Sequence, residues 1–396
     1  MKAGWQRKKL ADVLKIQNGY AFDSKKFNPS KGMPLVRIRS LKLGIETETW
    51  FDGDYDEKYV VEAGDLLIGM DGEFGCFEWK GNPSLLNQRV CRLQEFTDAL
   101  IPKFLFYGVN EYLKAIEDVT GFTTVKHLSS KQVLEIEFPV PPLPEQHRIV
   151  AILDEAFDGI ATAKANAEKN LQNARALFES HLQSVFTARG DGWVEKRIGD
   201  ACDLLNGFAF KSGDVVAESN TQLVRMGNLY GNQLDLERSA VFYPDNFAKD
   251  YARYLLNEGD LIMSLTGTTG KEDYGYTVRI PDCGHKLLMN QRIAKFSSIK
   301  TDVVISDYLL HYLRSRAFLD VLYPTANGTR QANLSSITIK TLPLPLCPIL
   351  EQKKISSELD ELIVETQRLE SIYQQKLTAL DDLKKSLLHQ AFSGQL

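Results

Sequence analysis

Predicted turns and loops contain most of the side chains in this sequence that could bind a nucleic acid. Arginine, glutamine and asparagine can make two hydrogen bonds to one base edge, and lysine, arginine and threonine can bind backbone phosphates. For each such residue the alternative is an ordinary solvated turn or strand face. The residues whose loop position and side-chain chemistry would allow such contacts with DNA are Lys25, Arg37, Arg39, Lys42, Thr123, Thr124, Lys126, Lys211, Arg225, Thr268, Thr269, Lys271, Arg330, Gln331 and Asn333.

Residues 34–41 alternate apolar and basic side chains, which predicts a strand. Its apolar residues would face the interior, and Arg37 and Arg39 would face solvent, where they could read guanine or hold phosphate. Two Gly-containing polar loops, 121–127 and 327–333, follow stretches with helical periodicity. The second loop is rich in the side chains that fit base edges, although a solvated turn fits both loops as well.

The loop Gly267-Thr268-Thr269-Gly270-Lys271 resembles a phosphate-binding loop at first sight. Such a loop needs four residues between its glycines and a Ser or Thr after the lysine, whereas this one has two residues and Glu272. A hairpin loop between strands is therefore the better prediction, and its polar tip could still face DNA.

Catalytic motifs are missing from the sequence. The six histidines show no HExxH or other metal-ligand spacing. There is no glycine-rich cofactor loop, no Asn-Pro-Pro-aromatic tetrapeptide typical of base-amino methyltransferases, and no Pro-Asp followed by the acidic-x-Lys group of nucleases. We therefore expect no catalytic residue, metal or cofactor in this chain.

Two long stretches, 145–186 and 351–392, carry apolar residues at steps of three and four and are predicted to be helices. At about 1.5 Å per residue each would be roughly 60 Å long, which favours two halves of one coiled coil. Thr366 and Lys376 interrupt the second seam. The first seam is expected at Ile149, Leu153, Ala156, Ile160, Ala163, Ala167, Leu171, Ala174, Phe178, Leu182 and Val185. The second is expected at Ile355, Leu359, Leu362, Leu369, Tyr373, Leu380, Leu383 and Leu387.

The sequence that precedes each helix is repeated in order. GWQRKKLADVLKIQNGYAF begins at Gly4, and GWVEKRIGDACDLLNGFAF begins at Gly192. The offset grows from 188 to 206 along the chain, as loop insertions would produce, while the preserved order predicts one fold used twice. The later matched anchors are Leu35-Val36-Arg37 with Leu223-Val224-Arg225, Gly64-Asp65-Leu66 with Gly259-Asp260-Leu261, Asn87-Gln88-Arg89 with Asn290-Gln291-Arg292, Leu128-Ser129-Ser130 with Leu334-Ser335-Ser336, and Glu145-Gln146 with Glu351-Gln352.

This duplication defines the expected architecture of an α+β chain. Residues 1–144 and 190–350 would form two α/β globular halves, and 145–189 and 351–396 would form the two helices. Each half ends in a proline-rich segment, FPVPPLPEQ or LPLPLCPILEQ. Such a segment predicts a stiff, extended connector that fixes the direction of the helix that follows it.

Composition sets modest bounds on function. The 396 residues, 43% of them hydrophobic and 25% charged, are typical of a globular chain of two or three domains. Lys and Arg number 47 against 52 Asp and Glu, so bulk charge gives no nucleic-acid signal, and phosphate contacts would have to arise locally or from a partner. Five scattered cysteines without a CxxC pair predict reduced thiols in a cytoplasmic protein, and no apolar run is long enough for a membrane span.

Together these motifs resemble the specificity (S) subunit of type I restriction-modification enzymes. The resemblance rests on the paired GW…NGxAF openings, the GDLL and GDLI turns, the NQR strands, the connectors ending in EQ and the long helices ending in VF or AF. It covers essentially the whole chain. In that family each variable half is a target-recognition domain that reads one part of a split DNA sequence, and the two long helices pack antiparallel between the domains.

The resemblance also implies partners. Two methyltransferase (M) subunits dock on the S subunit, and two restriction (R) subunits complete the nuclease. The S subunit does no chemistry, so the methyl donor, ATP and magnesium would belong to the partners. Antiparallel helices would give a pseudo-two-fold chain that matches a bipartite site on double-stranded DNA, with helix length setting the spacer.

Alternative functions remain open at this point. Ile363, Ile372, Leu377 and Leu388 lie off the predicted seam and could either bind partner helices or pack against the recognition domains of the same chain. The whole chain could also be a coiled-coil adaptor whose two domains bind protein rather than DNA, which the near-neutral charge would allow. A nucleotide hydrolase that uses the Gly267 loop is the third possibility.

Overall fold

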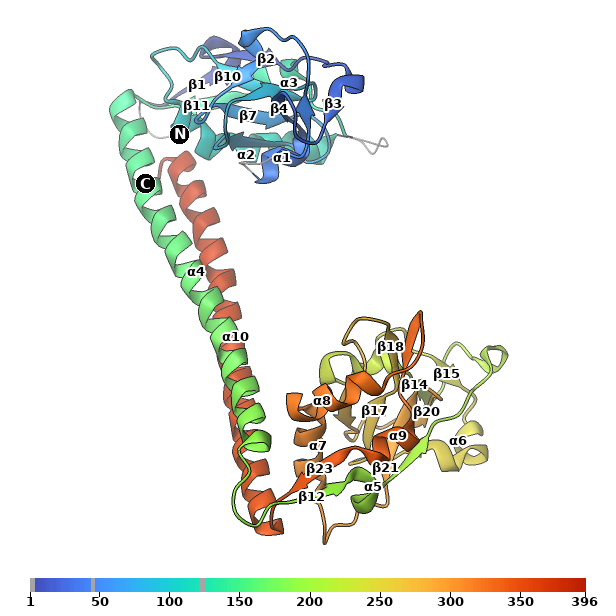
Figure 1. The fold of residues 1–396 in the computed structure, drawn as a ribbon. Coiled ribbons are helices and arrows are strands. Elements are labelled where there is room, and N and C mark those ends of the chain that lie inside the picture. The colour runs from blue at the N-terminus through green and yellow to red at the C-terminus, as the bar shows by residue number, and fades with distance from the viewer. Residues whose placement is uncertain (1–3, 44–46, 121–125) are drawn as a thin grey trace. The chain divides into compact units, whose positions relative to one another are not determined.

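The computed structural model describes residues 4–43, 47–120 and 126–396, and it divides into two compact units (Figure 1). Unit 1 comprises residues 1–167 and 375–396, and unit 2 comprises residues 168–374. The two long helices are α4 (Leu143–Thr187) and α10 (Ile349–Ser393), and each is divided between the two units.

Unit 1 is a mixed α/β fold of short strands and three shorter helices that precede the long helix α4. Its strands are β1 (Gln6–Lys9), β2 (Lys15–Asn18), β3 (Phe27–Asn28), β4 (Met33–Val36), β5 (Trp50–Phe51), β6 (Val60–Val61), β7 (Leu66–Gly69), β8 (Gly75–Glu78), β9 (Ser84–Leu86), β10 (Val90–Gln94) and β11 (Glu137–Val140). Its shorter helices are α1 (Ile38–Leu43), α2 (Pro102–Val119) and α3 (Ser130–Leu134).

Unit 2 follows the same plan with a few added elements. Its strands are β12 (Val194–Arg197), β13 (Asp203–Asn206), β14 (Thr221–Val224), β15 (Phe242–Tyr243), β16 (Leu255–Leu256), β17 (Leu261–Ser264), β18 (Thr266–Thr268), β19 (Thr277–Arg279), β20 (Lys286–Met289), β21 (Ile293–Ser297), β22 (Gln331–Asn333) and β23 (Pro343–Leu346). Its shorter helices are α5 (Ile198–Ala201), α6 (Phe247–Asp250), α7 (Ser306–Arg314), α8 (Arg316–Leu322) and α9 (Ser336–Thr341).

Strand pairing confirms that one fold is used twice. The four-stranded sheet β2-β10-β7-β8 of unit 1 corresponds to β13-β21-β17-β19 of unit 2. The order β5-β4-β9-β6 corresponds to β15-β14-β20-β16, and the two-stranded pair β1-β11 corresponds to β12-β23. In both units one central pair is parallel, β4 with β9 and β14 with β20. The predicted duplication therefore extends to the direction of the strands.

Three local predictions need correction. The strand expected at residues 34–41 ends at Val36, and Arg39 lies on the short helix α1. The stretch with helical periodicity before the loop 327–333 is two helices, α7 and α8, because the hydroxyl of Ser315 caps the second by accepting from the Phe318 backbone N–H. The loop expected at 327–333 contains a strand, β22, which pairs with β18.

Each unit has its own hydrophobic core, and an aromatic ring at the end of a long helix belongs to it. Phe392 of α10 packs against Phe104 in unit 1, with ring centroids 5.0 Å apart. Phe186 of α4 lies 5.3 Å from the rings of both Tyr308 and Tyr312 in unit 2. The helix endings VF and AF are therefore anchors, because the buried Phe186 ring and the partly buried Phe392 ring both favour the docked helix end.

A fully buried glutamine fixes the start of α4 in unit 1. The Gln146 side chain accepts a hydrogen bond from the backbone N–H of Ile101, 2.8 Å away, at the residue that precedes α2. Its amide nitrogen donates to the carbonyl oxygens of Ala99 and Pro141, each at 2.8 Å. Without the Gln146 side chain these three backbone groups would be buried or half-buried and would lose this hydrogen bond. Replacing the glutamine should therefore destabilise the start of α4.

Unit 2 repeats this arrangement with Gln352 at the start of α10. Its side-chain oxygen accepts from the backbone N–H of Ile305 at 3.0 Å, and its amide donates to the carbonyl oxygens of Val303 and Cys347 at 3.0 and 2.9 Å. The repeated EQ motif thus has a physical explanation, since each glutamine ties three chain segments to one helix.

The long helices run antiparallel within each unit. In unit 1 the Arg148 guanidinium donates to the carbonyl oxygen of Leu396, and Lys164 pairs with Asp381 at 2.7 Å. In unit 2 Arg175 pairs with Glu370 at 2.6 Å. The predicted first seam is buried or half-buried throughout, whereas the second seam leaves Leu383 47% exposed. In the part of the chain that the structure describes, no helix combines the length and the hydropathy needed to cross a membrane.

A histidine in unit 2 replaces a tyrosine of unit 1 at the contact between globular part and helix. The Tyr107 hydroxyl of α2 donates to Asp154 of α4. At the corresponding place His311 of α7 lies with Nε2 3.0 Å from Asp360 of α10, and its Nδ1 is buried without a hydrogen-bond partner. Burial lowers the pKa of His311 below its ordinary value of 6.5, although the Asp360 carboxylate works in the opposite direction.

We expect acid to destabilise unit 2 through His311. Below about pH 6.5 the unfolded chain binds a proton that the folded chain resists, so stability falls as the pH drops through that value. His311→Tyr introduces the tyrosine–aspartate pair that Tyr107 and Asp154 form in unit 1. This variant should lose less Tm between pH 7.5 and 5.5 than the wild type, by about 2–4 °C. His389→Tyr, at an exposed histidine of α10, is the matched control. An equal acid sensitivity in all three proteins would contradict the role of His311.

Candidate nucleic-acid interface

The parallel strand pair of each unit brings two polar segments to one edge of a sheet. Because β4 and β9 are parallel, the residues that follow them emerge side by side. These residues are Arg37-Ile38-Arg39 after β4 and Asn87-Gln88-Arg89 after β9. In unit 2 the equivalent strands β14 and β20 are followed by Arg225-Met226-Gly227-Asn228 and by Asn290-Gln291-Arg292.

The two segments line a pocket in each unit. The pocket of unit 1 has a volume of about 270 Å³, and that of unit 2 about 430 Å³. Both present three arginines and an Asn-Gln pair, which are the side chains best suited to phosphate and to base edges. We call them the unit 1 pocket, lined by Arg37, Ile38, Arg39, Asp71, Asn87, Gln88 and Arg89, and the unit 2 pocket, lined by Arg225, Met226, Gly227, Asn228, Arg238, Ser239, Asn290, Gln291 and Arg292.

The NGxAF motif supports the Asn-Gln-Arg turn from behind. In unit 1 the backbone N–H of Tyr20 donates to the carbonyl of Leu86, and the N–H of Gln88 donates to the carbonyl of Tyr20. Phe208 makes the same two bonds in unit 2, to Met289 and from Gln291.

A side chain at the glycine of this motif would collide with the turn. A Cβ atom on Gly19 would lie 2.0 Å from the carbonyl oxygen of Asn87, and one on Gly207 would lie 2.1 Å from that of Asn290. The glycine is therefore required by close backbone approach rather than by an unusual φ angle.

The two pockets hold their arginines differently. In the unit 1 pocket Arg89 Nε lies 3.5 Å from Asp71 Oδ2, and His127 Nδ1 lies 2.7 Å from Asp71 Oδ1. In the unit 2 pocket Arg225 donates to the Ser239 carbonyl, and the Arg238 guanidinium lies 5.2 Å from the centre of the Tyr230 ring. Among the residues that line the unit 2 pocket none is acidic, whereas Asp71 lines the unit 1 pocket.

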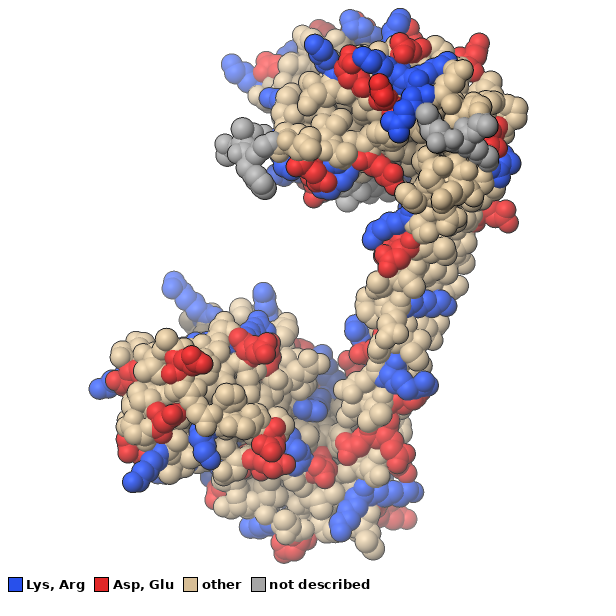
Figure 2. Space-filling view, turned by 180° about the vertical axis from the view of Figure 1, so that it is seen from behind, with Lys and Arg blue, Asp and Glu red and all other residues tan. Residues whose placement is uncertain are grey.

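Charged side chains elsewhere are mixed. Figure 2 shows basic and acidic groups interspersed over the visible face of both units, without a continuous basic surface. This agrees with the net charge of −5 and directs attention to the pockets, where local arrangement concentrates positive charge.

The structure brings several of the predicted contact residues together. Arg37 and Arg39 line the unit 1 pocket, and Arg225 lines the unit 2 pocket. A second group gathers where β18 pairs with β22 in unit 2, with Thr268 opposite Gln331 and Thr266 opposite Asn333. The predicted residues on or beside this strand pair are Thr268, Thr269, Lys271, Arg330, Gln331 and Asn333.

Other predicted residues lie apart from both pockets. Lys126 is turned inward, since its ammonium group donates to the Glu117 carbonyl at 2.8 Å. Lys25 belongs to an exposed turn capped by Asp23, and the carbonyl of Lys211 accepts a hydrogen bond from Tyr243. Thr123, Thr124 and the side chain of Lys42 lie outside the described residues.

Sequence reasoning missed the residues that complete the pockets. Asn87, Gln88 and Arg89, with their counterparts Asn290, Gln291 and Arg292, were recognised only as markers of the repeat. Polar residues that recur in the same order in both halves, directly after an apolar strand, were the available signal. Arg238 has no such signal, because it reaches the unit 2 pocket from the connection between β14 and β15, which contains no matched motif after Arg225.

The predicted partner-binding residues of α10 differ in exposure. Ile372 is 43% exposed, Ile363 and Leu377 are half-buried, and Leu388 packs against the hydrophobic core of unit 1. The packing of Leu388 corresponds to contact within the chain.

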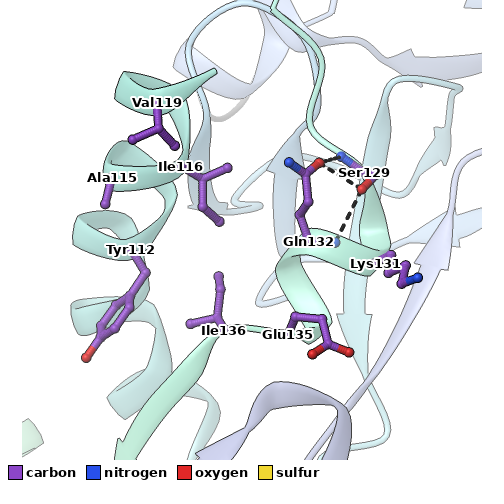
Figure 3. A pocket seen from close by; sticks show the side chains of 9 residues that line it. All are labelled: Tyr112, Ala115, Ile116, Val119, Ser129, Lys131, Gln132, Glu135 and Ile136. Atoms are coloured by element: carbon purple, nitrogen blue, oxygen red, sulfur yellow. Dashed lines mark hydrogen bonds between the residues drawn. The ribbon is translucent and has the colours of Figure 1, made fainter. Parts of the chain in front are cut away.

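A larger cavity of about 570 Å³ lies between α2 and α3 in unit 1 and has a different character (Figure 3). One wall is apolar and includes Val119, which is 84% exposed. On the other wall Ser129 and Gln132 are engaged with each other, because they form the capping box of α3. This cavity therefore offers little to phosphate or base edges.

Within 4–43, 47–120 and 126–396 no group of three or more His, Cys, Asp and Glu side chains is placed to hold a metal ion.

Comparisons with known proteins agree on one family. The model of the type I restriction modification DNA specificity domain matches residues 2–172 and again 190–379. The chain is 26% identical over 423 aligned positions to the type I restriction enzyme EcoBI specificity subunit of Escherichia coli, covering 99% of this chain and 86% of that one. It is 21% identical to the MjaVIII specificity subunit of Methanocaldococcus jannaschii, covering 92% of this chain and 86% of that one.

Solved structures share the fold. A chain from a study of assembly and conformational transition in a type I R-M system superposes with a TM-score of 0.73 at 20% identity, covering 100% of this chain and 99% of that one. The HsdS subunit of Thermoanaerobacter tengcongensis gives a TM-score of 0.59 at 18% identity, covering 100% and 98%. With two family matches that together span most of the sequence, this chain belongs to the type I restriction modification DNA specificity domain family.

Proposed function

We propose that this chain is the sequence-reading subunit of a type I restriction-modification complex and that each unit reads one part of a bipartite site on double-stranded DNA. One observation carries the proposal: each unit has a pocket with three arginines and an Asn-Gln pair, and the two pockets lie at equivalent edges of equivalent sheets. Two unlike readers on one repeated scaffold suit two unlike half-sites, by the same geometry that matches dimeric repressors to spaced half-sites.

The proposed division of the chain follows the repeat. Residues 1–144 and 190–350 would be the two target-recognition domains, and 145–189 and 351–396 the helices that connect them and set the spacer. The antiparallel ion pairs of α4 with α10 support a helical connector. The exposed Ile372 and the half-buried Ile363 and Leu377 would help to dock methyltransferase subunits.

The chemistry of the pockets suits duplex DNA more than protein. Arginine forks bind phosphate oxygens or the O6 and N7 atoms of guanine, and Asn and Gln amides match the N6 and N7 atoms of adenine. Six arginines around two pockets would provide the positive potential that the chain lacks as a whole.

We also propose that methylation, cleavage and ATP hydrolysis belong to the partner subunits, two M and two R. The Gly267 loop supports this, because its donors are already occupied. Asp273 accepts from the backbone N–H of Thr268 at 2.6 Å and from its hydroxyl at 2.7 Å. Burial works to raise the pKa of Asp273, but these hydrogen bonds lower it overall, so a charged carboxylate lies where a phosphate would bind.

The test removes the arginines of one pocket in the complete complex. The chain is co-expressed with its methyltransferase partner, the genomic methylation pattern defines the target, and that duplex is titrated with salt. Arg225→Ala/Arg238→Ala/Arg292→Ala should abolish methylation at the wild-type sites and reduce the slope of log K against log salt concentration by up to about 3.

A matched variant removes the same charge elsewhere in unit 2. Lys249, Arg253 and Arg316 are exposed and lie outside the pocket. Their triple alanine variant should methylate the wild-type sites with nearly the wild-type salt slope. The proposal is wrong if the pocket variant and this control behave alike.

A further inference from the structure

Arg89 of the unit 1 pocket has an unusual backbone conformation. Its φ angle is +74°, whereas its repeat counterpart Arg292 is not among the residues with positive φ. A branched or long side chain rarely adopts this left-handed region, and such residues persist mainly where surrounding contacts hold them at functional sites. The carbonyl of Arg89 accepts from the Met70 N–H at 2.9 Å, which helps to hold the turn.

Asp71 holds the guanidinium of Arg89 from one side. Asp71 Oδ2 lies 3.5 Å from Arg89 Nε, so the two terminal nitrogens are not used by this carboxylate. Asp71 is itself fixed, because its backbone forms a bridge with that of His127 and its Oδ1 lies 2.7 Å from His127 Nδ1. At that distance the imidazole N–H donates to the carboxylate, so Nδ1 has no free lone pair for the Arg89 Nη1 that lies 3.3 Å away.

The Arg89 guanidinium is thus held by Asp71 at its Nε, and the residue lines two hollows. Arg89 lines the unit 1 pocket and also an adjoining hollow of about 290 Å³ that includes Asn18, His127 and Ser130. Its side chain is 55% exposed, against 22% for Asp71, so the fork is accessible while the carboxylate that orients it is sheltered. A pre-oriented fork loses less side-chain freedom when it makes two hydrogen bonds to one ligand.

The second unit lacks this device. His127 and Asn333 are equivalent residues, because each directly precedes the matched Leu-Ser-Ser motif. Asp71 forms a backbone bridge with His127, and Thr266 pairs with Asn333, so Thr266 is the unit 2 equivalent of Asp71. Thr266 carries no charge, and its hydroxyl contacts Met226 Sδ at 2.7 Å instead. Among the described residues the Arg292 side chain has no ion-pair or hydrogen-bond partner, so nothing fixes its fork in advance.

We propose that Arg89 reads a guanine in the half-site bound by unit 1 and that Asp71 is the residue that positions it. The ligand would be the O6 and N7 acceptors on the major-groove edge of one G·C pair, approached by Nη1 and Nη2. The inference rests on the proposed function and adds to it a base, a residue and an orienting carboxylate. Phosphate has the same acceptor chemistry, and the test separates the two ligands.

The experiment compares methylation patterns of the complete complex carrying Asp71→Asn or Arg89→Lys, in a host without its own copy of the chain. Asp71→Asn removes the charge that orients the fork, and Arg89→Lys removes the fork. Both variants should relax one G·C position of one half-site, lowering the preference for guanine over the next base by about 5- to 100-fold, while the other half-site stays unchanged. Arg7→Lys, at an exposed arginine of unit 1 outside both hollows, is the control and should leave that G·C position as in the wild type.

Three outcomes would overturn the inference. The wild-type half-site assigned to unit 1 could contain no invariant G·C pair, or the variants could weaken all sites equally without relaxing any base, which would indicate a phosphate contact. Unchanged patterns would exclude any role for Arg89 in recognition. Retained specificity at the other half-site shows that the variant is folded. Failure of the proposed function itself gives a different result, because methylation would then not depend on this chain even in the wild type.

Discussion

Gln352→Leu is expected to lower the free energy of unfolding of unit 2 by several kcal/mol, about 3–5 kcal/mol. The leucine fills much of the same volume but leaves the Ile305 N–H and the carbonyl oxygens of Val303 and Cys347 without their partner. The glutamine is fully buried, so solvent does not replace the lost bonds. Each buried group left unpaired costs about 1–3 kcal/mol, and domains are stable by only about 5–15 kcal/mol.

The effect should be local to one unit, and this makes the measurement specific. Hydrogen exchange of the full chain should show lost protection in α7 and at the start of α10, with the strands of unit 1 unaffected. Gln146→Leu should give the mirror result, with lost protection at the start of α2 and α4. Gln367→Leu, at an exposed position of α10, is the control. Wild-type protection of α7 in the Gln352 variant would show that the glutamine does not hold the helix.

Repetition is what made the architecture predictable from the sequence. A single NGxAF or EQ motif predicts little, but matched motifs in the same order imply the same strand order, and both units have it. The long helices were predictable because apolar residues at steps of three and four, sustained over ten or so turns, are typical of long helices and of little else. Local boundaries were less predictable, as residues 34–41 show, because α1 starts where the alternating pattern still suggests a strand.

The pockets were not predictable because they depend on pairing between distant segments. β4 and β9 are far apart in the chain, and only their parallel pairing places Arg37 beside Asn87. Three of the predicted arginines nonetheless line pockets, since arginine after a strand end is a usable signal. The clamp of Arg89 by Asp71 has no counterpart in the sequence pattern, because a positive φ angle and a side-chain contact across a sheet leave no periodicity behind.

The same reasoning explains the uneven seam of α10. Leu383 follows the heptad spacing but is 47% exposed, and Leu388 is off the seam but packs against the core of unit 1. Near its end α10 no longer packs only against α4, since Phe392 and Leu388 also pack against the core of unit 1. A heptad pattern describes a helix pair well only where the pair has no third neighbour.

Lengthening both long helices by one turn is expected to move the two half-sites apart. Four helix-forming residues inserted after Asn170 in α4 and after Gln374 in α10 lie opposite each other, between the ion pairs Lys164–Asp381 and Arg175–Glu370. They add about 6 Å to each helix, which corresponds to one to two base pairs at about 3.4 Å each. Methylation should therefore disappear from the wild-type sites and appear at the same two half-sites with a spacer longer by one or two base pairs.

The insertion must be made in both helices for this result. An insertion in α4 alone shifts the apolar seam of α4 by one turn relative to that of α10. It separates Lys164 from Asp381 or Arg175 from Glu370. This variant should therefore give little methylation at any spacer length. A seven-residue insertion in both helices preserves the heptad and should lengthen the spacer by about three base pairs, from about 10.5 Å of added helix. A spacer that stays constant across both double insertions would mean that the helices hold the chain together without measuring distance along DNA. A spacer that grows in step with helix length would show that recognition and measurement are separate functions of the same chain, one built from the pockets and the other from α4 and α10.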